Sequence, residues 1–140
     1  MLCSSSQSLD SCDKSLLSNA FNTQLIEFIE DIELVFSDDS SIKKVKSSLL
    51  MIKKVNPTLT IKIWYNYICS KYESEINNDN INFFLEKDYK NDLVDMNYSD
   101  DIIHNIDKLR EPIRNMSKEN QEKAFKYIKN LCILSKIYMQ

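Results

Sequence analysis

The fold class is decided by residues 21–36, FNTQLIEFIEDIELVF. Apolar side chains recur there at positions 21, 25, 28, 29, 32, 35 and 36, a spacing that gathers them into one stripe of an α-helix. We expect Asn19 or Asn22 to cap the start of this helix, and the polar run 37–39 to end it. The opposite face carries four acids, Glu27, Glu30, Asp31 and Glu33. The segment therefore predicts an amphipathic helix with an acidic outer face.

The residues that follow predict two more helices. Ser40 or Ser41 can cap a helix whose apolar residues stand at 42, 45, 49, 52 and 55. Asn56 and Pro57 are typical of a cap followed by proline in the first turn, so the next helix should begin there and run to about residue 72. Positions 61, 63 and 65 also alternate as in a strand, but the length of the run and the preceding Asn-Pro pair favour a helix.

The second half of the chain predicts a short helix over 81–85, an irregular polar loop over 86–98 and two further helices. The first of these begins at Ser99 and should kink or end near Arg110, because Pro112 lacks the amide hydrogen that a helix interior needs. Ser117 is the expected cap of the last helix. The buried face of that helix should comprise Phe125, Ile128, Leu131, Cys132, Ser135 and Tyr138.

The chain of 140 residues contains no glycine, which restricts the turns it can make. Tight β-hairpin turns favour glycine because it adopts positive φ at little cost, so a sheet-rich fold is disfavoured. We therefore expect an all-α fold, a compact bundle of about five helices plus one short helix. Residues 1–18, which hold seven serines, should form a flexible N-terminal arm, and residues 19–140 a single helical domain.

The lack of glycine also removes the loops with which many enzymes and nucleotide-binding proteins hold phosphate. The single histidine, His104, stands near Asp100 and Asp107, which could orient an imidazole as a general base, but no nucleophile accompanies it. Five aspartates over residues 88–101 lack the ligand spacing of a calcium loop. We therefore expect a protein that is not an enzyme, with no catalytic, metal or cofactor site.

Four cysteines stand at positions 3, 12, 69 and 132, and no two form the close pair typical of zinc sites. We find no signal peptide, and no apolar run approaches the ~18–20 residues of a membrane span. These features predict a reduced protein that acts inside a cell, in the cytoplasm or nucleus, or in a virion, with no membrane among its partners.

Charge alternates in blocks along the chain, although the net charge is only −3. Residues 1–39 and 73–111 each carry a charge of −7, residues 40–72 carry +7, and residues 112–140 carry +4. Opposed blocks of this kind also allow head-to-tail self-association into a homo-oligomer.

The basic block gives one candidate surface, a nucleic-acid-binding face. Lysines contact phosphate without reading sequence, and exposed aromatic rings can stack on bases. The alternative is that the aromatic residues belong to the core and the lysines complement the acidic helix. The residues concerned are Lys43, Lys44, Lys46, Lys53, Lys54 and Lys62, interleaved with Trp64, Tyr65, Tyr67 and Tyr72.

Two other segments are candidate protein-binding surfaces, the acidic helix over 27–39 and the loop over 86–98. The first presents Glu27, Glu30 and Asp31. The second presents Tyr89, Leu93, Met96 and Tyr98.

Four segments resemble small helical proteins of unassigned activity in nucleocytoplasmic large DNA viruses, the giant viruses. They are residues 21–31 (FNTQLIEFIED), 54–57 (KVNP), 83–89 (FFLEKDY) and 109–113 (LREPI), and the similarity covers roughly residues 21–138. The excess of Asn, Lys and Ile over Gly, Ala, Arg and Pro fits an AT-rich genome of that kind. The resemblance implies an origin and supplies no catalytic residue.

Size and helix number are also similar to those of the helical Bcl-2-like proteins of poxviruses, which bind host helices in a groove. The Asn-Trp-Gly-Arg type of signature of that fold cannot occur here, because glycine is absent and Tyr65 follows Trp64. We therefore expect a non-enzymatic viral protein that binds a viral or host protein, as a structural component or host-factor adaptor. The alternative is a nucleic-acid-associated protein that uses the lysine and aromatic block over 43–72.

Overall fold

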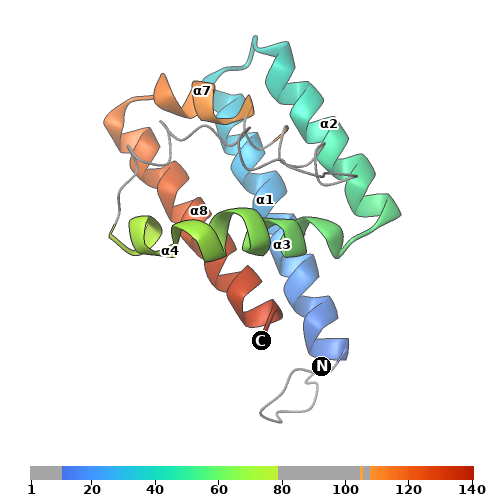
Figure 1. Cartoon of the computed structure of the whole chain (residues 1–140). Coiled ribbons are helices and arrows are strands. Elements are labelled where there is room, and N and C mark those ends of the chain that lie inside the picture. The colour runs from blue at the N-terminus through green and yellow to red at the C-terminus, as the bar shows by residue number, and fades with distance from the viewer. Residues whose placement is uncertain (1–10, 79–104, 106–107) are drawn as a thin grey trace.

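The protein is an assembly of helices (Figure 1). A computed structural model describes residues 11–78, 105 and 108–140, and within them the chain forms helices and turns with no strand. The all-α prediction is confirmed. The described helices are α1 (Ser11–Val35), α2 (Ser40–Val55), α3 (Leu59–Trp64), the π-helix η1 (Tyr65–Cys69), α4 (Ser70–Asn77), α7 (Arg110–Arg114) and α8 (Lys118–Tyr138).

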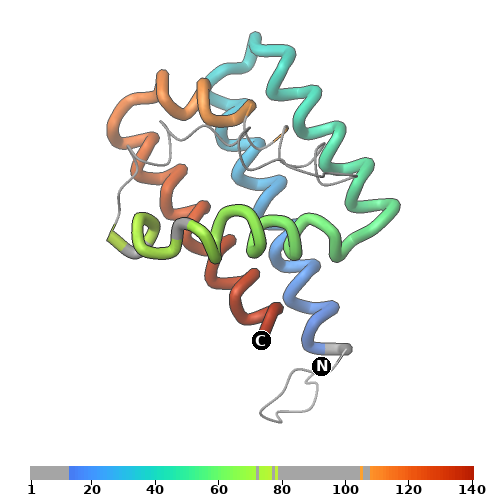
Figure 2. Tube along the Cα trace, viewed as in Figure 1, coloured from blue at the N-terminus to red at the C-terminus, as the bar shows by residue number. Residues whose placement is uncertain are grey.

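Two long helices form the centre of the bundle. Helices α1 and α8 pack along each other in opposite directions, and α2 packs antiparallel to α1 on its other side (Figure 1). The segment from α3 through η1 to α4 forms one nearly continuous rod that crosses α1 and α8 (Figure 2). Helix α7 lies against the beginning of α8.

Helix α1 begins earlier than the sequence pattern predicted. It starts at Ser11, so Asn19 and Asn22 lie inside the helix and cap nothing, and the predicted flexible arm is helical from Ser11 onward. Residues 1–10 lie outside the described residues. Ser18 is buried, and its hydroxyl donates to the Ser15 carbonyl oxygen at 3.1 Å. The helix extends because these residues pack on the bundle, a tertiary effect that local propensity does not report.

The predicted caps of the next two helices were displaced by one or two residues. Asp39, and neither Ser40 nor Ser41, caps α2, and its carboxylate accepts from the Ser41 amide at 2.9 Å. Asn56 ends α2 instead of starting α3, and its side chain accepts from the Thr58 amide at 3.3 Å. Helix α3 therefore begins only at Leu59.

Three other predictions about the helices are confirmed. Residues 59–77 are helical and not a strand. Ser117 caps α8 by accepting from the Asn120 amide at 3.2 Å, and all six residues of the predicted α8 face are buried. A new helix, α7, begins at Arg110, and Pro112 sits in its first turn, where a missing amide hydrogen costs little. The predicted helix over 81–85 and the start at Ser99 lie outside the described residues.

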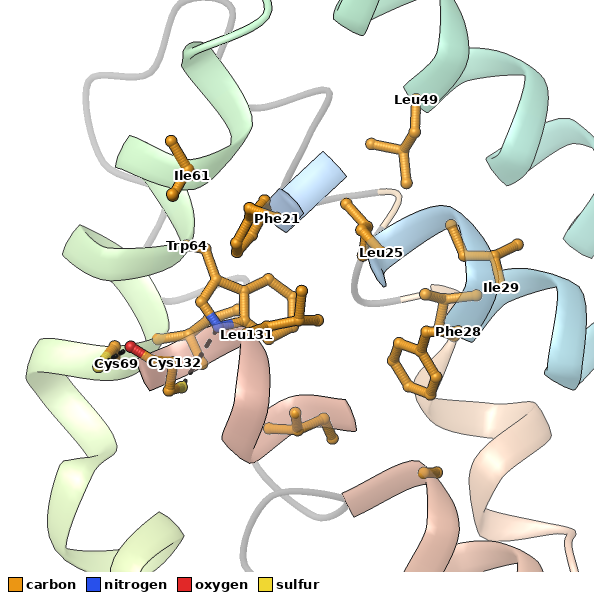
Figure 3. Close-up of a cluster of buried hydrophobic side chains, with 14 of the residues drawn as sticks. Phe21, Leu25, Phe28, Ile29, Leu49, Ile61, Trp64, Cys69, Leu131 and Cys132 are labelled. Atoms are coloured by element: carbon orange, nitrogen blue, oxygen red, sulfur yellow. Dashed lines mark hydrogen bonds between the residues drawn. The ribbon is translucent and has the colours of Figure 1, made fainter. Parts of the chain in front are cut away.

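The core forms where the crossing rod meets α1 and α8 (Figure 3). Trp64 is 1 % exposed, and its ring meets that of Phe21 edge-on, with centroids 5.9 Å apart. Leu131 of α8 lies beside them and is fully buried. Asn22 ties α1 to the α2–α3 connection, because its side-chain amide donates to the Pro57 carbonyl oxygen at 2.8 Å.

Candidate functional site

The acidic face of α1 is partly used within the fold. Lys46 of α2 pairs with Glu30 at 3.1 Å and with Glu33 at 3.6 Å. The hydrogen bond from Lys46 to Glu30 is the main reason that the pKa of Lys46 is raised. Two residues from different predicted surfaces therefore meet each other, Glu30 from the protein-binding set and Lys46 from the nucleic-acid set.

The other five lysines of the predicted nucleic-acid face are exposed, on α2 and α3. The aromatic residues of that predicted face are less accessible than its lysines. Trp64 is buried in the core, and Tyr65 and Tyr67 are partly buried against it. Stacking on a base by Trp64 is therefore excluded in this conformation, and the lysines offer charge without a complete stacking platform.

The predicted loop surface and the single histidine belong to the part of the chain outside the described residues. Tyr89, Leu93, Met96 and Tyr98 lie outside the described residues, as does His104. The side chain of Tyr72 is likewise outside them.

A groove opens between α1 and α8 at the end of the bundle where α7 packs. Its volume is about 220 Å³. Its lining is largely apolar and comes from both helices: Phe28, Asp31, Ile32, Leu34 and Val35 of α1, Asn120, Lys123, Ala124 and Tyr127 of α8, and Met116 between α7 and α8. Leu34 is 81 % exposed beside it, and Val35 is 44 % exposed. Exposed apolar side chains that gather beside a groove make it a candidate interaction site.

Two acids stand at one edge of the groove, Asp31 in its lining and Glu27 near Tyr127. The Tyr127 ring stacks on Phe28, with centroids 5.2 Å apart, and its hydroxyl is hydrogen-bonded to Asp31. Burial is the first cause that raises the pKa of Tyr127, and the bond to Asp31 and the charge of Glu27 add to it. Glu27 and Asp31, both predicted as protein-binding residues, are thus close to Tyr127 at one edge, while Lys123 is the basic residue in the lining.

The sequence pattern missed the α8 half of this groove. Lys123, Ala124 and Tyr127 are ordinary residues of an amphipathic helix, and nothing in their spacing marks a site. A signal was present in α1, because Leu34 is a large apolar residue that falls outside the apolar stripe of residues 21–36. A leucine on the acidic face of a helix is a candidate contact residue.

The described helices also bear on membranes and metals. None of them combines the length and the apolar character needed to cross a lipid bilayer. Among the described residues, no three His, Cys, Asp or Glu side chains gather into a potential metal site.

Comparison with known proteins found no matching family model, no similar curated protein and no similar solved structure. A function for this chain therefore rests on the chemistry of its own surfaces, of which the α1/α8 groove is the best defined.

Proposed function

We propose that the protein acts without catalysis, by binding a segment of a protein partner in the α1/α8 groove. The observation that carries this proposal is the groove itself, with Leu34 and Val35 exposed beside an apolar lining. At about 220 Å³ the groove is smaller than the ~300–1,000 Å³ of typical small-molecule pockets. Such a space suits a few anchoring side chains of a protein better than an enclosed metabolite.

The charges around the groove favour a partner segment that is apolar and basic. Large apolar side chains would fill the space between Phe28, Ala124 and Met116. Lysine or arginine at the edge of the segment would face Glu27 and Asp31. Burial of apolar area would supply most of the affinity, and the charges would set orientation and partner choice. In the biological setting that the sequence suggests, this describes a structural component or host-factor adaptor of a large DNA virus, inside the infected cell or in the virion.

The test uses a synthetic helical peptide with leucines on one face and lysines along its edge, and a matched peptide with glutamate in place of each lysine. Binding of the fluorescently labelled peptides to the full chain is followed by anisotropy. We expect the lysine peptide to bind more tightly. Leu34→Glu should weaken that binding at least about tenfold, which corresponds to ~1.4 kcal/mol.

Met51→Glu is the matched control, because Met51 is an exposed apolar residue of α2 that does not line the groove. It changes charge equally and should leave binding intact. Equal affinity for both peptides, or equal loss in both variants, would refute the groove as the site. Sedimentation of the protein alone tests the other possible occupant of the groove, a second copy of the chain. Self-association that Leu34→Glu abolishes would show that a second copy fills the groove, and would overturn the external partner.

Nucleic-acid binding is the second candidate function, supported by the exposure of Lys43, Lys44, Lys53, Lys54 and Lys62. Because contacts to phosphate release counterions, such binding would fall steeply with added salt. Reversing the charge of Lys43, Lys44 and Lys54 together should abolish binding to single-stranded DNA at low salt. If the unaltered protein binds no DNA even at low salt, this function is excluded.

A further inference from the structure

A second pocket, separate from the groove and independent of the function proposed for it, holds two cysteines. Cys69 is the last residue of η1 and Cys132 lies on α8. The Cys69 thiol donates to the Cys132 carbonyl oxygen at 3.6 Å, and the Trp64 indole N–H donates to the Cys132 sulfur at 3.3 Å (Figure 3). One residue of α8 is thus contacted by two residues of the crossing rod.

The π-helix explains how both contacts arise. In it the Ser70 amide donates to the Tyr65 carbonyl oxygen, five residues back. A turn of this width brings residues five apart toward the same face, whereas in an α-helix residues three and four apart share a face. Trp64 and Cys69 are five residues apart, and both contact Cys132. Turns of this kind are frequent at functional sites.

The two sulfurs are buried but lie at a pocket that opens to the surface. The pocket has a volume of about 90 Å³ and is lined by Cys69, Glu73, Ile76, Lys129, Cys132, Ile133 and Lys136. Ile133 is 55 % exposed at its mouth, while Cys69 and Cys132 are only 3 % and 5 % exposed. Since a water molecule occupies ~30 Å³ of liquid, the pocket admits a small oxidant and excludes a protein thiol.

The surroundings make the two cysteines chemically unequal. The interaction with the Cys132 side chain is the main cause that lowers the pKa of Cys69 to about 7, against the opposing effects of burial and of Glu73. Ser135 and Lys136 also favour the Cys69 thiolate. The pKa of Cys132 is raised, first by its bond to Cys69 and then by burial. Near neutral pH a substantial fraction of Cys69 is therefore thiolate, while Cys132 remains a thiol.

We propose that Cys69 and Cys132 form a redox-sensitive pair, in which a small hydroperoxide oxidises Cys69 and Cys132 then resolves the product as an intramolecular disulfide. In the first step the Cys69 sulfur attacks one peroxide oxygen, the O–O bond breaks, and sulfenic acid and hydroxide form. In the second step the Cys132 sulfur attacks the Cys69 sulfur, the S–OH bond breaks, and the departing hydroxide takes the Cys132 proton and leaves as water. The hydroxide of the first step takes up the proton that Cys69 released to solvent when its thiolate formed. With hydrogen peroxide, two thiols and one peroxide give one disulfide and two waters.

The test exposes the reduced full-length protein to hydrogen peroxide near neutral pH, blocks free thiols and maps every cysteine by mass spectrometry. We expect a Cys69–Cys132 cross-link, with the loss of two hydrogen atoms, before Cys3 or Cys12 is oxidised. In Cys132→Ser the sulfenic acid should persist at Cys69 and be trapped by dimedone. Cys69→Ser should leave Cys132 unmodified. The unaltered protein decides the question even if a variant fails to fold, since oxidation of Cys69 no faster than that of Cys3 or Cys12 overturns the proposal.

Two surface variants at the mouth of the pocket separate this role from simple packing. Glu73 and Lys136 form an ion pair there, and they act in opposite directions on the Cys69 thiolate. Glu73→Gln should therefore shift the pH midpoint of Cys69 alkylation downward, and Lys136→Gln should shift it upward. Neither side chain is buried, so the fold should persist in both. Midpoints that move together, or not at all, would overturn the assignment of Cys69 as the reactive thiol.

Discussion

Trp64 gives the sharpest test of how the bundle is held together. It lies 1 % exposed where the crossing rod meets α1 and α8, edge-on to Phe21 and hydrogen-bonded to Cys132. A buried tryptophan removes ~150–250 Å² from water, worth ~4–6 kcal/mol at ~25 cal/mol per Å². Partial relaxation around the cavity brings the usual cost of truncation to alanine to ~3–5 kcal/mol. We therefore expect Trp64→Ala to lower the free energy of unfolding by about 4 kcal/mol, a large part of the ~5–15 kcal/mol typical of a domain.

The assay is urea unfolding followed by far-ultraviolet circular dichroism, since the variant loses the only tryptophan of the chain. Trp64→Phe is the matched variant. It keeps a ring opposite Phe21 but loses the indole donor to Cys132, so it should cost about 1–2 kcal/mol. In the unaltered protein, tryptophan emission should be blue-shifted and insensitive to aqueous quenchers. A cost below ~1 kcal/mol for Trp64→Ala would refute the central position of this residue. It would also reopen base stacking by Trp64.

Three further predictions concern single contacts. Asn22→Ala should lower the free energy of unfolding, measured with urea, by about 1 kcal/mol, because it removes a side-chain donor that links α1 to the α2–α3 connection. The control Asn19→Ala, at an exposed position of α1, should change that free energy little. Equal effects of the two variants would contradict the link. Ser117→Ala should cost about 1 kcal/mol through loss of the α8 cap, while Ser47→Ala, within α2, should be neutral or slightly stabilising. Because the pKa of Cys69 falls from 9.0 to about 7 on folding, the native state releases a proton that the unfolded chain keeps, so the free energy of unfolding should rise from pH 7 to pH 9. Cys69→Ser should flatten that rise, and an unchanged slope would contradict the shift.

Local patterns predicted the helices well and their ends poorly. The stripe in residues 21–36 and the α8 face that begins at Phe125 follow from a period of 3.6 residues. The α8 face is buried as expected, and so is the stripe up to Ile32, but at the end of α1 Val35 is exposed and Phe36 is only partly buried. Helix ends depend on a few hydrogen bonds with several candidate donors and acceptors nearby. Asp39 rather than Ser40 caps α2, and Asn56 closes that helix rather than opening α3, because one residue can serve either end.

The candidate sites were less predictable because each joins residues far apart in sequence. The acidic face of α1 was visible, and Asp31 does lie in the groove, but the partner wall comes from α8 about 90 residues later. The lysine and aromatic block looked like one surface, yet Lys46 pairs with Glu30 and Trp64 enters the core. Cys69 and Cys132 are too far apart in the sequence to form a close-pair motif, and no periodicity of the sequence predicts a π-helix.

The sequence by itself determined that the chain is helical, because apolar periodicity and the absence of glycine are properties of neighbouring residues. Both properties can be read directly from the order of residues, because the geometry of the helical backbone fixes which neighbouring residues share a face. Only the tertiary structure decided which elements cover each apolar face and which charges are neutralised. It also decided which buried thiols meet. These outcomes depend on how α1, α8 and the crossing rod pack, since burial and Coulomb energies are set by distances in space rather than by separation along the chain.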